Sequence, residues 1–125
     1  MSGNKMTNEE LHFLGIKVVY KDLIDRGYKV LNVRKEFDVN PQILVEINDS
    51  KALIMVKTAR FPNMGVLVPE IASQVKELAI KHKANLFFAS VGIANANGDT
   101  DEEMAEPEVG GEYYINYKGL TQIEV

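Results

Sequence analysis

The stretch that decides the fold reads ILVEINDSKALIMVK, residues 43–57. Two apolar runs, 43–47 and 51–57, enclose Asn48 and Asp49. These two residue types adopt the positive φ angles that a two-residue turn requires, so the stretch predicts a β-hairpin.

A turn at Asn48 and Asp49 also fixes which residues face each other. The predicted cross-strand pairs are Ile47–Ser50, Glu46–Lys51, Leu44–Leu53, Gln42–Met55 and Asn40–Lys57, and all but the first share one face. The opposite face carries the β-branched side chains of Ile43, Val45, Ile54 and Val56. We expect the β-branched face to pack on the helices and the mixed face to border a cleft or solvent.

The residues before the hairpin predict a helix and a strand. Thr7 and Glu10 match a capping box, which satisfies the free N–H groups at the start of a helix. Apolar residues then recur every three or four positions until Gly27, which suits the left-handed residue that follows a helix. We therefore expect a helix over roughly residues 8–26 and a strand over residues 28–33.

The residues after the hairpin predict a crossover and further strands. Pro69 suits the first position of a helix, where its missing N–H costs no hydrogen bond. A helix between two buried strands favours parallel pairing of those strands. The expected elements are a loop over 61–68, a helix from 69 to 81–83, a buried strand over 86–91, and terminal strands over 112–117 and 120–125 that form an edge hairpin or a pairing surface.

Composition predicts one small domain over residues 1–125, with a flexible start over residues 1–7. The chain has 125 residues, and 46% of them are hydrophobic, which is enough for one continuous core. It has no cysteine, no apolar leader and no long apolar run, so we expect a cytoplasmic protein without membrane partners. Dimerisation through an edge strand or a helix is compatible with a domain of this size.

The net charge of -4 is unevenly distributed along the chain. Six acidic residues lie close together without a basic residue among them: Asp99, Asp101, Glu102, Glu103, Glu106 and Glu108. Removing these six from the 18 acidic residues leaves 12, against 14 basic residues. Residues 95–111 are expected to form a mobile acidic loop, and one interpretation treats this loop as a mask over a basic face or as a surface for a basic partner.

The order of elements and several residues together resemble the PD-(D/E)xK, or restriction-endonuclease-like, superfamily. The residues that carry the resemblance are Gly15, Leu23 and Gly27-Tyr28 in the first helix region, then Val56-Lys57-Thr58 and Ala59-Arg60 after the hairpin. Their spacing is most similar to the small bacterial YraN-type branch, over roughly residues 8–93. The resemblance implies an α/β domain with a three-layer core and a mixed β-sheet, in the order helix, strand, hairpin, helix, strand, followed by C-terminal strands.

The same resemblance implies a magnesium-dependent active site whose acidic residues this chain lacks. The acidic positions of the superfamily fall on Ile16, Gln42 and Met55, and only its lysine is present, as Lys57. Mg²⁺ takes hard oxygen ligands, usually including carboxylates, whereas a thioether is a soft ligand. We therefore expect no catalytic metal and no cofactor, and a degenerate cleft formed by Gln42, Met55 and Lys57.

Two hypotheses of function follow from this pattern. The leading one is a non-catalytic nuclease-fold module that binds a nucleic acid or a protein through the degenerate cleft or the terminal strands. The alternative is a metal-dependent endonuclease with rearranged ligands, in which Lys57 and Glu70 are the catalytic candidates and Mg²⁺ is the cofactor. Glu70 also fits a carboxylate that complements a helix dipole, and Lys57 also fits a lysine whose stem packs on the sheet. A Lys57–Glu70 ion pair is the arrangement to look for.

Two other groups have simpler interpretations. Glu46 lies about 13 Å along the strand from Gln42, at about 3.3 Å per residue, and is expected to pair with Lys51. His12 and His82 have no second histidine or cysteine at ligand spacing, so no zinc site is expected.

Overall fold

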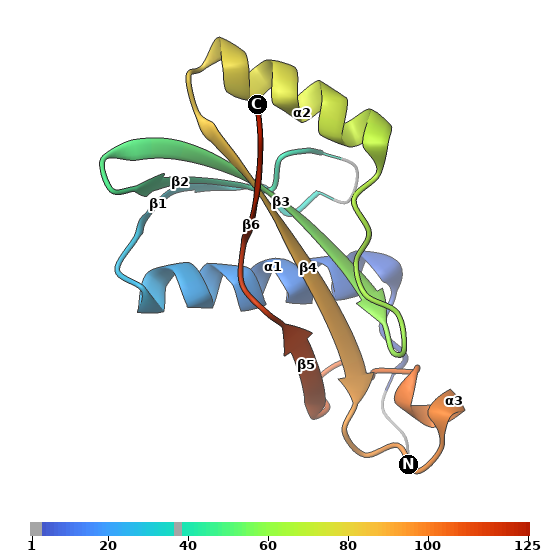
Figure 1. Cartoon of the computed structure of the whole chain (residues 1–125). Coiled ribbons are helices and arrows are strands. Elements are labelled where there is room, and N and C mark those ends of the chain that lie inside the picture. The colour runs from blue at the N-terminus through green and yellow to red at the C-terminus, as the bar shows by residue number, and fades with distance from the viewer. Residues whose placement is uncertain (1–3, 37–38) are drawn as a thin grey trace.

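Six strands form one mixed sheet in the computed structural model, which describes residues 4–36 and 39–125. The elements in chain order are α1 (Asn8–Asp25), β1 (Lys29–Val33), β2 (Ile43–Ile47), β3 (Ser50–Arg60), α2 (Pro69–Lys81), β4 (Asn85–Asn95), α3 (Asp101–Met104), β5 (Tyr113–Tyr117) and β6 (Thr121–Ile123). The strand order is β1-β2-β3-β4-β5, and β6 also pairs with β4. The helix α1 lies on one side of the sheet and α2 on the other (Figure 1). The mixed α/β class and the predicted order of the main elements are confirmed.

The hairpin forms where the sequence predicts it. Asn48 and Asp49 have φ angles of 50° and 68°, and the three predicted cross-strand pairs nearest the turn are present. The strand β3 continues past Lys57 to Arg60, because it pairs in parallel with β4 along its whole second half. The helix α2 connects these two strands, so the predicted crossover to a parallel neighbour is confirmed.

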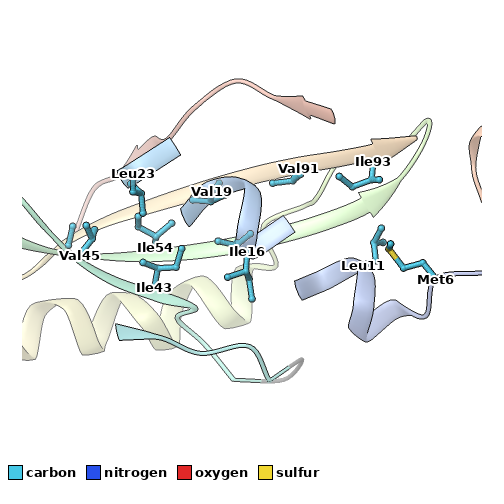
Figure 2. Packing of buried hydrophobic residues seen from close by; sticks show 13 residues of the cluster. Met6, Leu11, Ile16, Val19, Leu23, Ile43, Val45, Ile54, Val91 and Ile93 are labelled. Atoms are coloured by element: carbon cyan, nitrogen blue, oxygen red, sulfur yellow. The ribbon is translucent and has the colours of Figure 1, made fainter. Parts of the chain in front are cut away.

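The sheet lies between two hydrophobic cores. The first core joins α1 to the β-branched face of the hairpin, and its buried members include Ile16, Val19, Ile43, Ile54 and Val91 (Figure 2). The second core joins α2 to the opposite face and includes Leu53, Met55, Val75, Ala79 and Leu86. The β-branched face therefore packs on a helix as predicted. The mixed face, however, is covered at Leu53 and Met55, because α2 packs over it.

Capping and a tyrosine contact hold α1 in place. Thr7 and Glu10 form the predicted capping box, and Gly27 follows the helix with a φ of 82°. Tyr117 on β5 donates its hydroxyl to Asp22 Oδ2 (3.1 Å), and burial together with this carboxylate raises the pKa of Tyr117, which keeps it a donor. Among the described residues, neither α1 nor any other helix combines the length and the apolar character that a membrane span needs.

Two predictions about flexible segments are wrong where the structure describes them. The segment expected as an acidic loop contains α3, which Thr100 caps by accepting a hydrogen bond from Glu103 N (3.1 Å). Met6, expected in a flexible start, is buried, and its N–H donates to Pro107 O (3.0 Å). The capping signal and these contacts outweigh the polar composition of both segments. Residues 1–3 lie outside the described residues.

The terminal strands also differ from one of the two predicted arrangements. Within the described chain β5 and β6 do not pair with each other; both pair antiparallel with β4, at residues 91–95 and 86–88 respectively. The expected edge hairpin is therefore wrong. The reason is the length of β4, which extends over 11 residues and offers enough free edge for both strands.

Gly15 should be necessary for the close approach of α1 to β3. A Cβ atom at this position would lie 1.7 Å from Thr58 Oγ1 and 2.8 Å from Thr58 Cβ. Despite the better helix propensity of alanine, Gly15→Ala should lower the free energy of unfolding by about 1–3 kcal/mol, as overpacking does. Urea denaturation measures this. The exposed change Lys17→Ala on the same helix should stay within about 0.5 kcal/mol of the wild type, and an equally small effect of Gly15→Ala would contradict the packing.

Candidate functional site

Four polar side chains gather where α1, the connection between β1 and β2, and β3 meet. They are His12, Asn40, Gln42 and Lys57, here termed the polar cluster. His12 and Gln42 are buried, with exposed fractions of 5% and 0%, whereas Asn40 and Lys57 are half-buried. The cluster thus brings together two of the predicted site residues, Gln42 and Lys57.

Gln42 is the centre of the hydrogen bonds in the polar cluster. Its backbone N–H donates to Ile54 O (3.0 Å), and its side-chain Oε1 accepts from Val56 N (2.7 Å). Its Nε2 donates to Val39 O and to Asn40 Oδ1, both at 2.8 Å. The side chain of Gln42 therefore takes the place of a main-chain partner for β3, just before β2 begins.

The predicted opposition of Gln42 and Met55 is not formed. Regular pairing of β2 with β3 begins at Ile43–Ile54, and Gln42 bonds to the residues on either side of Met55. The physical reason is Pro41, which has no N–H with which to extend the ladder. Met55 itself is 0% exposed in the second core, so it does not line an open cleft.

Lys57 reaches the polar cluster through its ammonium group. Nζ donates to Asn40 Oδ1 (3.0 Å), the same oxygen that accepts from Gln42. Burial lowers the pKa of Lys57, because the charged form is partly removed from water. No carboxylate forms an ion pair with Lys57 within the described chain. The predicted neighbours Asn40 and Lys57 are therefore joined by a hydrogen bond, in which the Lys57 ammonium is the donor and the neutral Asn40 amide is the acceptor.

His12 is the member of the polar cluster that the sequence interpretation missed. It lies one helical turn before Ile16, the position to which the resemblance assigns an acidic residue, so the two share one side of α1. Burial lowers the pKa of His12, the charge of Lys57 lowers it further, and a backbone hydrogen bond with Glu36 acts in the opposite direction. The spacing from Ile16 is the signal that could have identified it.

Other charged residues considered from the sequence lie elsewhere. Glu70 is exposed in the first turn of α2, and none of the ion pairs in residues 4–36 and 39–125 joins it to Lys57. Glu46 faces Lys51 across the hairpin as predicted, but the described side chains of the two form no ion pair. Arg60, which contributes to the resemblance, donates from its guanidinium to the N-terminal segment and to the start of α1.

The donor set of the polar cluster does not suit Mg²⁺. The cluster offers an ammonium, an imidazole and two amides, and both amide oxygens already accept hydrogen bonds. No group of three or more His, Cys, Asp or Glu side chains that could hold a metal occurs in the part of the chain that is described. Magnesium sites in proteins usually require carboxylates. The described side chains of the cluster can therefore donate hydrogen bonds to an anion, and none of them is a carboxylate of the kind that Mg²⁺ prefers.

Two lysines and an aromatic ring lie next to the polar cluster. Lys17 Nζ lies 4.4 Å and Lys35 Nζ 5.8 Å from the centre of the Phe13 ring, distances typical of cation–π contacts. Phe13 follows His12 along α1 and is 37% exposed, and both lysines are exposed. We term Phe13, Lys17 and Lys35 the basic face. Phe13 and Lys17 of this face belong to α1, and Lys35 belongs to the connection between β1 and β2.

Replacing Gln42 tests whether its amide holds this end of the sheet together. Gln42→Leu leaves the buried N–H of Val56 without its acceptor, which should lower the free energy of unfolding by about 1–3 kcal/mol in urea denaturation. Gln42→Glu should also destabilise, because a carboxylate cannot donate to Val39 O and Asn40 Oδ1. Gln74→Leu replaces an exposed glutamine of α2 and should have no such effect; equal stability of all three variants would contradict the role of Gln42.

The buried His12 should make stability sensitive to acid. Its pKa lies below 6.5 in the folded chain, so above that pH both folded and unfolded chains carry a neutral ring. Below it the unfolded chain takes up a proton that the folded chain resists, and stability falls. Between about pH 7.5 and about pH 5.5, His12→Asn should lose less stability than the wild type, while exposed His82→Asn should lose as much. Urea denaturation at both pH values measures this, and identical losses in all three proteins would refute it.

The similarity of the chain to known proteins lies at the level of a family. No curated protein and no solved structure matches the chain. Residues 9–123, from α1 to β6, match one protein family, so the matched region contains the whole polar cluster and the basic face. The chain therefore belongs to the family described as Domain of unknown function (DUF8840).

Proposed function

We propose that this chain is a non-catalytic module of restriction-endonuclease-like architecture that binds a nucleic acid through the polar cluster and the basic face. The observation that carries the proposal is the position of Lys57. Its ammonium bonds to the Asn40 amide and acts electrostatically on the His12 imidazole, without a paired carboxylate in the described chain. The helix that carries His12 also carries Phe13 and Lys17, and Lys35 lies over the same ring.

The nuclease-like part of the proposal draws support from the arrangement of the central elements. A helix packs on one face of a mixed sheet, a hairpin supplies two neighbouring strands, and a second helix crosses over to a parallel strand. Lys57 lies on the second strand of that hairpin, where the superfamily carries its lysine. Fold alone does not establish function, so the chemistry of the site must carry the rest.

The absence of catalysis is proposed from the chemistry of the side chains. Metal-assisted phosphodiester hydrolysis requires oxygen ligands that hold Mg²⁺ against the phosphate and activate water. Gln42 uses its Oε1 to bind Val56 N, and Met55 is buried in an apolar core. The enzyme alternative needs Lys57 and Glu70 to act together, whereas Lys57 bonds to Asn40 and Glu70 is exposed on α2.

A nucleic acid suits this surface better than a protein does. Lysine ammonium groups neutralise phosphates, and Lys17 and Lys35 are both exposed on this surface. Lys17 and Lys35 both lie over Phe13, which keeps the two charges close together. Because the whole chain carries a charge of -4, we expect modest affinity that decreases steeply with salt. Masking of this surface by the acidic segment, and dimerisation, stay predictions.

Removing the two lysines of the basic face should weaken nucleic-acid binding and its salt dependence. Fluorescence anisotropy with labelled single- and double-stranded DNA and RNA, over a range of salt concentrations, measures both. For Lys17→Ala/Lys35→Ala, the slope of log affinity against log salt should fall by about 1.4–1.8, since each phosphate contact contributes about 0.7–0.9. Lys76→Ala/Lys118→Ala removes the same charge from α2 and from the turn before β6, both exposed. Equal binding by the two double variants would contradict the proposal.

The same oligonucleotides, incubated with Mg²⁺ or Mn²⁺, test for catalysis. We expect no hydrolysis. Cleavage that is lost in both Lys57→Ala and Glu70→Gln would establish the enzyme alternative instead.

A further inference from the structure

A hollow of about 260 Å³ lies beside α2, on the face of the sheet opposite α1. Its walls come from β1, β2, β3 and the C-terminal half of α2, because α2 packs over β3 and β4 and leaves the β1 side of this face uncovered. The apolar part of its surface includes Leu44, Leu53 and Leu78. The three leucines therefore form an apolar surface at the bottom of the hollow, here termed its apolar floor.

The charged side chains that line the hollow are cationic. They are Arg34 and Lys51, and none of the described residues that line it carries a carboxylate; Asn32, Gln42 and His82 complete its polar lining. Within residues 4–36 and 39–125, the side chains of Arg34 and Lys51 make no hydrogen bond or ion pair. Lys51 faces Glu46 across the hairpin and still forms no ion pair with it. Two cations that no described carboxylate pairs with thus border an apolar surface, which is an arrangement that favours an anion.

We infer that this hollow binds a small organic anion, with an anionic head group held by Arg34 and Lys51 and an apolar body on the three leucines. An inorganic anion would leave the apolar floor uncovered, and a neutral hydrocarbon would leave the two cations unpaired. The volume lies below the roughly 300–1,000 Å³ of pockets for drug-sized ligands, so the occupant is small. This site does not depend on the proposed binding of a nucleic acid.

Octanoate is a suitable probe, because it joins one carboxylate to a hydrocarbon chain. Isothermal titration calorimetry of the full chain should give saturable binding of octanoate at one site. Acetate, which lacks the chain, and octanol, which lacks the charge, should each bind at least about tenfold more weakly. Octanol binding as tightly as octanoate, or no saturable octanoate binding at millimolar concentration, would overturn the inference.

Variants of the two cations test where the anion binds. Arg34 and Lys51 are exposed, so Arg34→Ala/Lys51→Ala should fold, which far-ultraviolet circular dichroism checks. This variant should bind octanoate about tenfold or more weakly. Arg34→Lys/Lys51→Arg keeps both charges and should retain most of the affinity. Unchanged octanoate affinity in Arg34→Ala/Lys51→Ala would overturn the assignment of the site.

Control variants separate this inference from the nucleic-acid proposal. Lys17→Ala/Lys35→Ala, which removes the basic face, should bind octanoate as the wild type does, and so should Lys76→Ala/Lys118→Ala. These four lysines do not line the hollow. Loss of octanoate binding in either control would mean that overall charge, rather than the hollow, attracts the anion, and would overturn the site.

Discussion

The buried amide of Gln42 is the constraint on which the polar cluster depends. An amide is tolerated in a protein interior only when its donors and its acceptor are paired, and Gln42 pairs both of its amide donors and its acceptor oxygen. These bonds fix Asn40, and Asn40 in turn gives the ammonium of Lys57 its acceptor. The same amide therefore stabilises the end of the sheet and orients the acceptor of the Lys57 ammonium.

Local signals in the sequence predict most of the fold correctly. Asn48 and Asp49 define the hairpin, Thr7 and Glu10 define the start of α1, and Pro69 marks the start of α2, because each acts through hydrogen bonds or backbone angles within a few residues. The errors concern contacts between distant segments. The packing of the chain start on the acidic segment, and the joint attachment of β5 and β6 to β4, depend on tertiary partners that periodicity does not reveal.

The candidate site is predicted only in part, for the same reason. The alignment of the hairpin with a known pattern selects Gln42 and Lys57, whose side chains both donate to Asn40 Oδ1 in the structure. It places Met55 at an open cleft, whereas α2 covers it, and it does not include His12, which joins from another element. Two further features appear only in the folded chain and could not be predicted from the sequence. Lys17 and Lys35 lie over one ring, and Arg34 and Lys51 line one hollow.

Because both terminal strands are attached to a single strand, one part of the sheet can unfold separately from the rest. Since β5 and β6 pair only with β4 among the described strands, they can open together while the hairpin, the helices α1 and α2 and the β3–β4 pair keep their own hydrogen bonds. Partial unfolding of this kind occurs in the least stable unit of a fold, and it exposes the amide protons of that unit to exchange with solvent. The hydroxyl of Tyr117, bonded to Asp22, links this outer unit to α1 and so couples its opening to the rest of the protein.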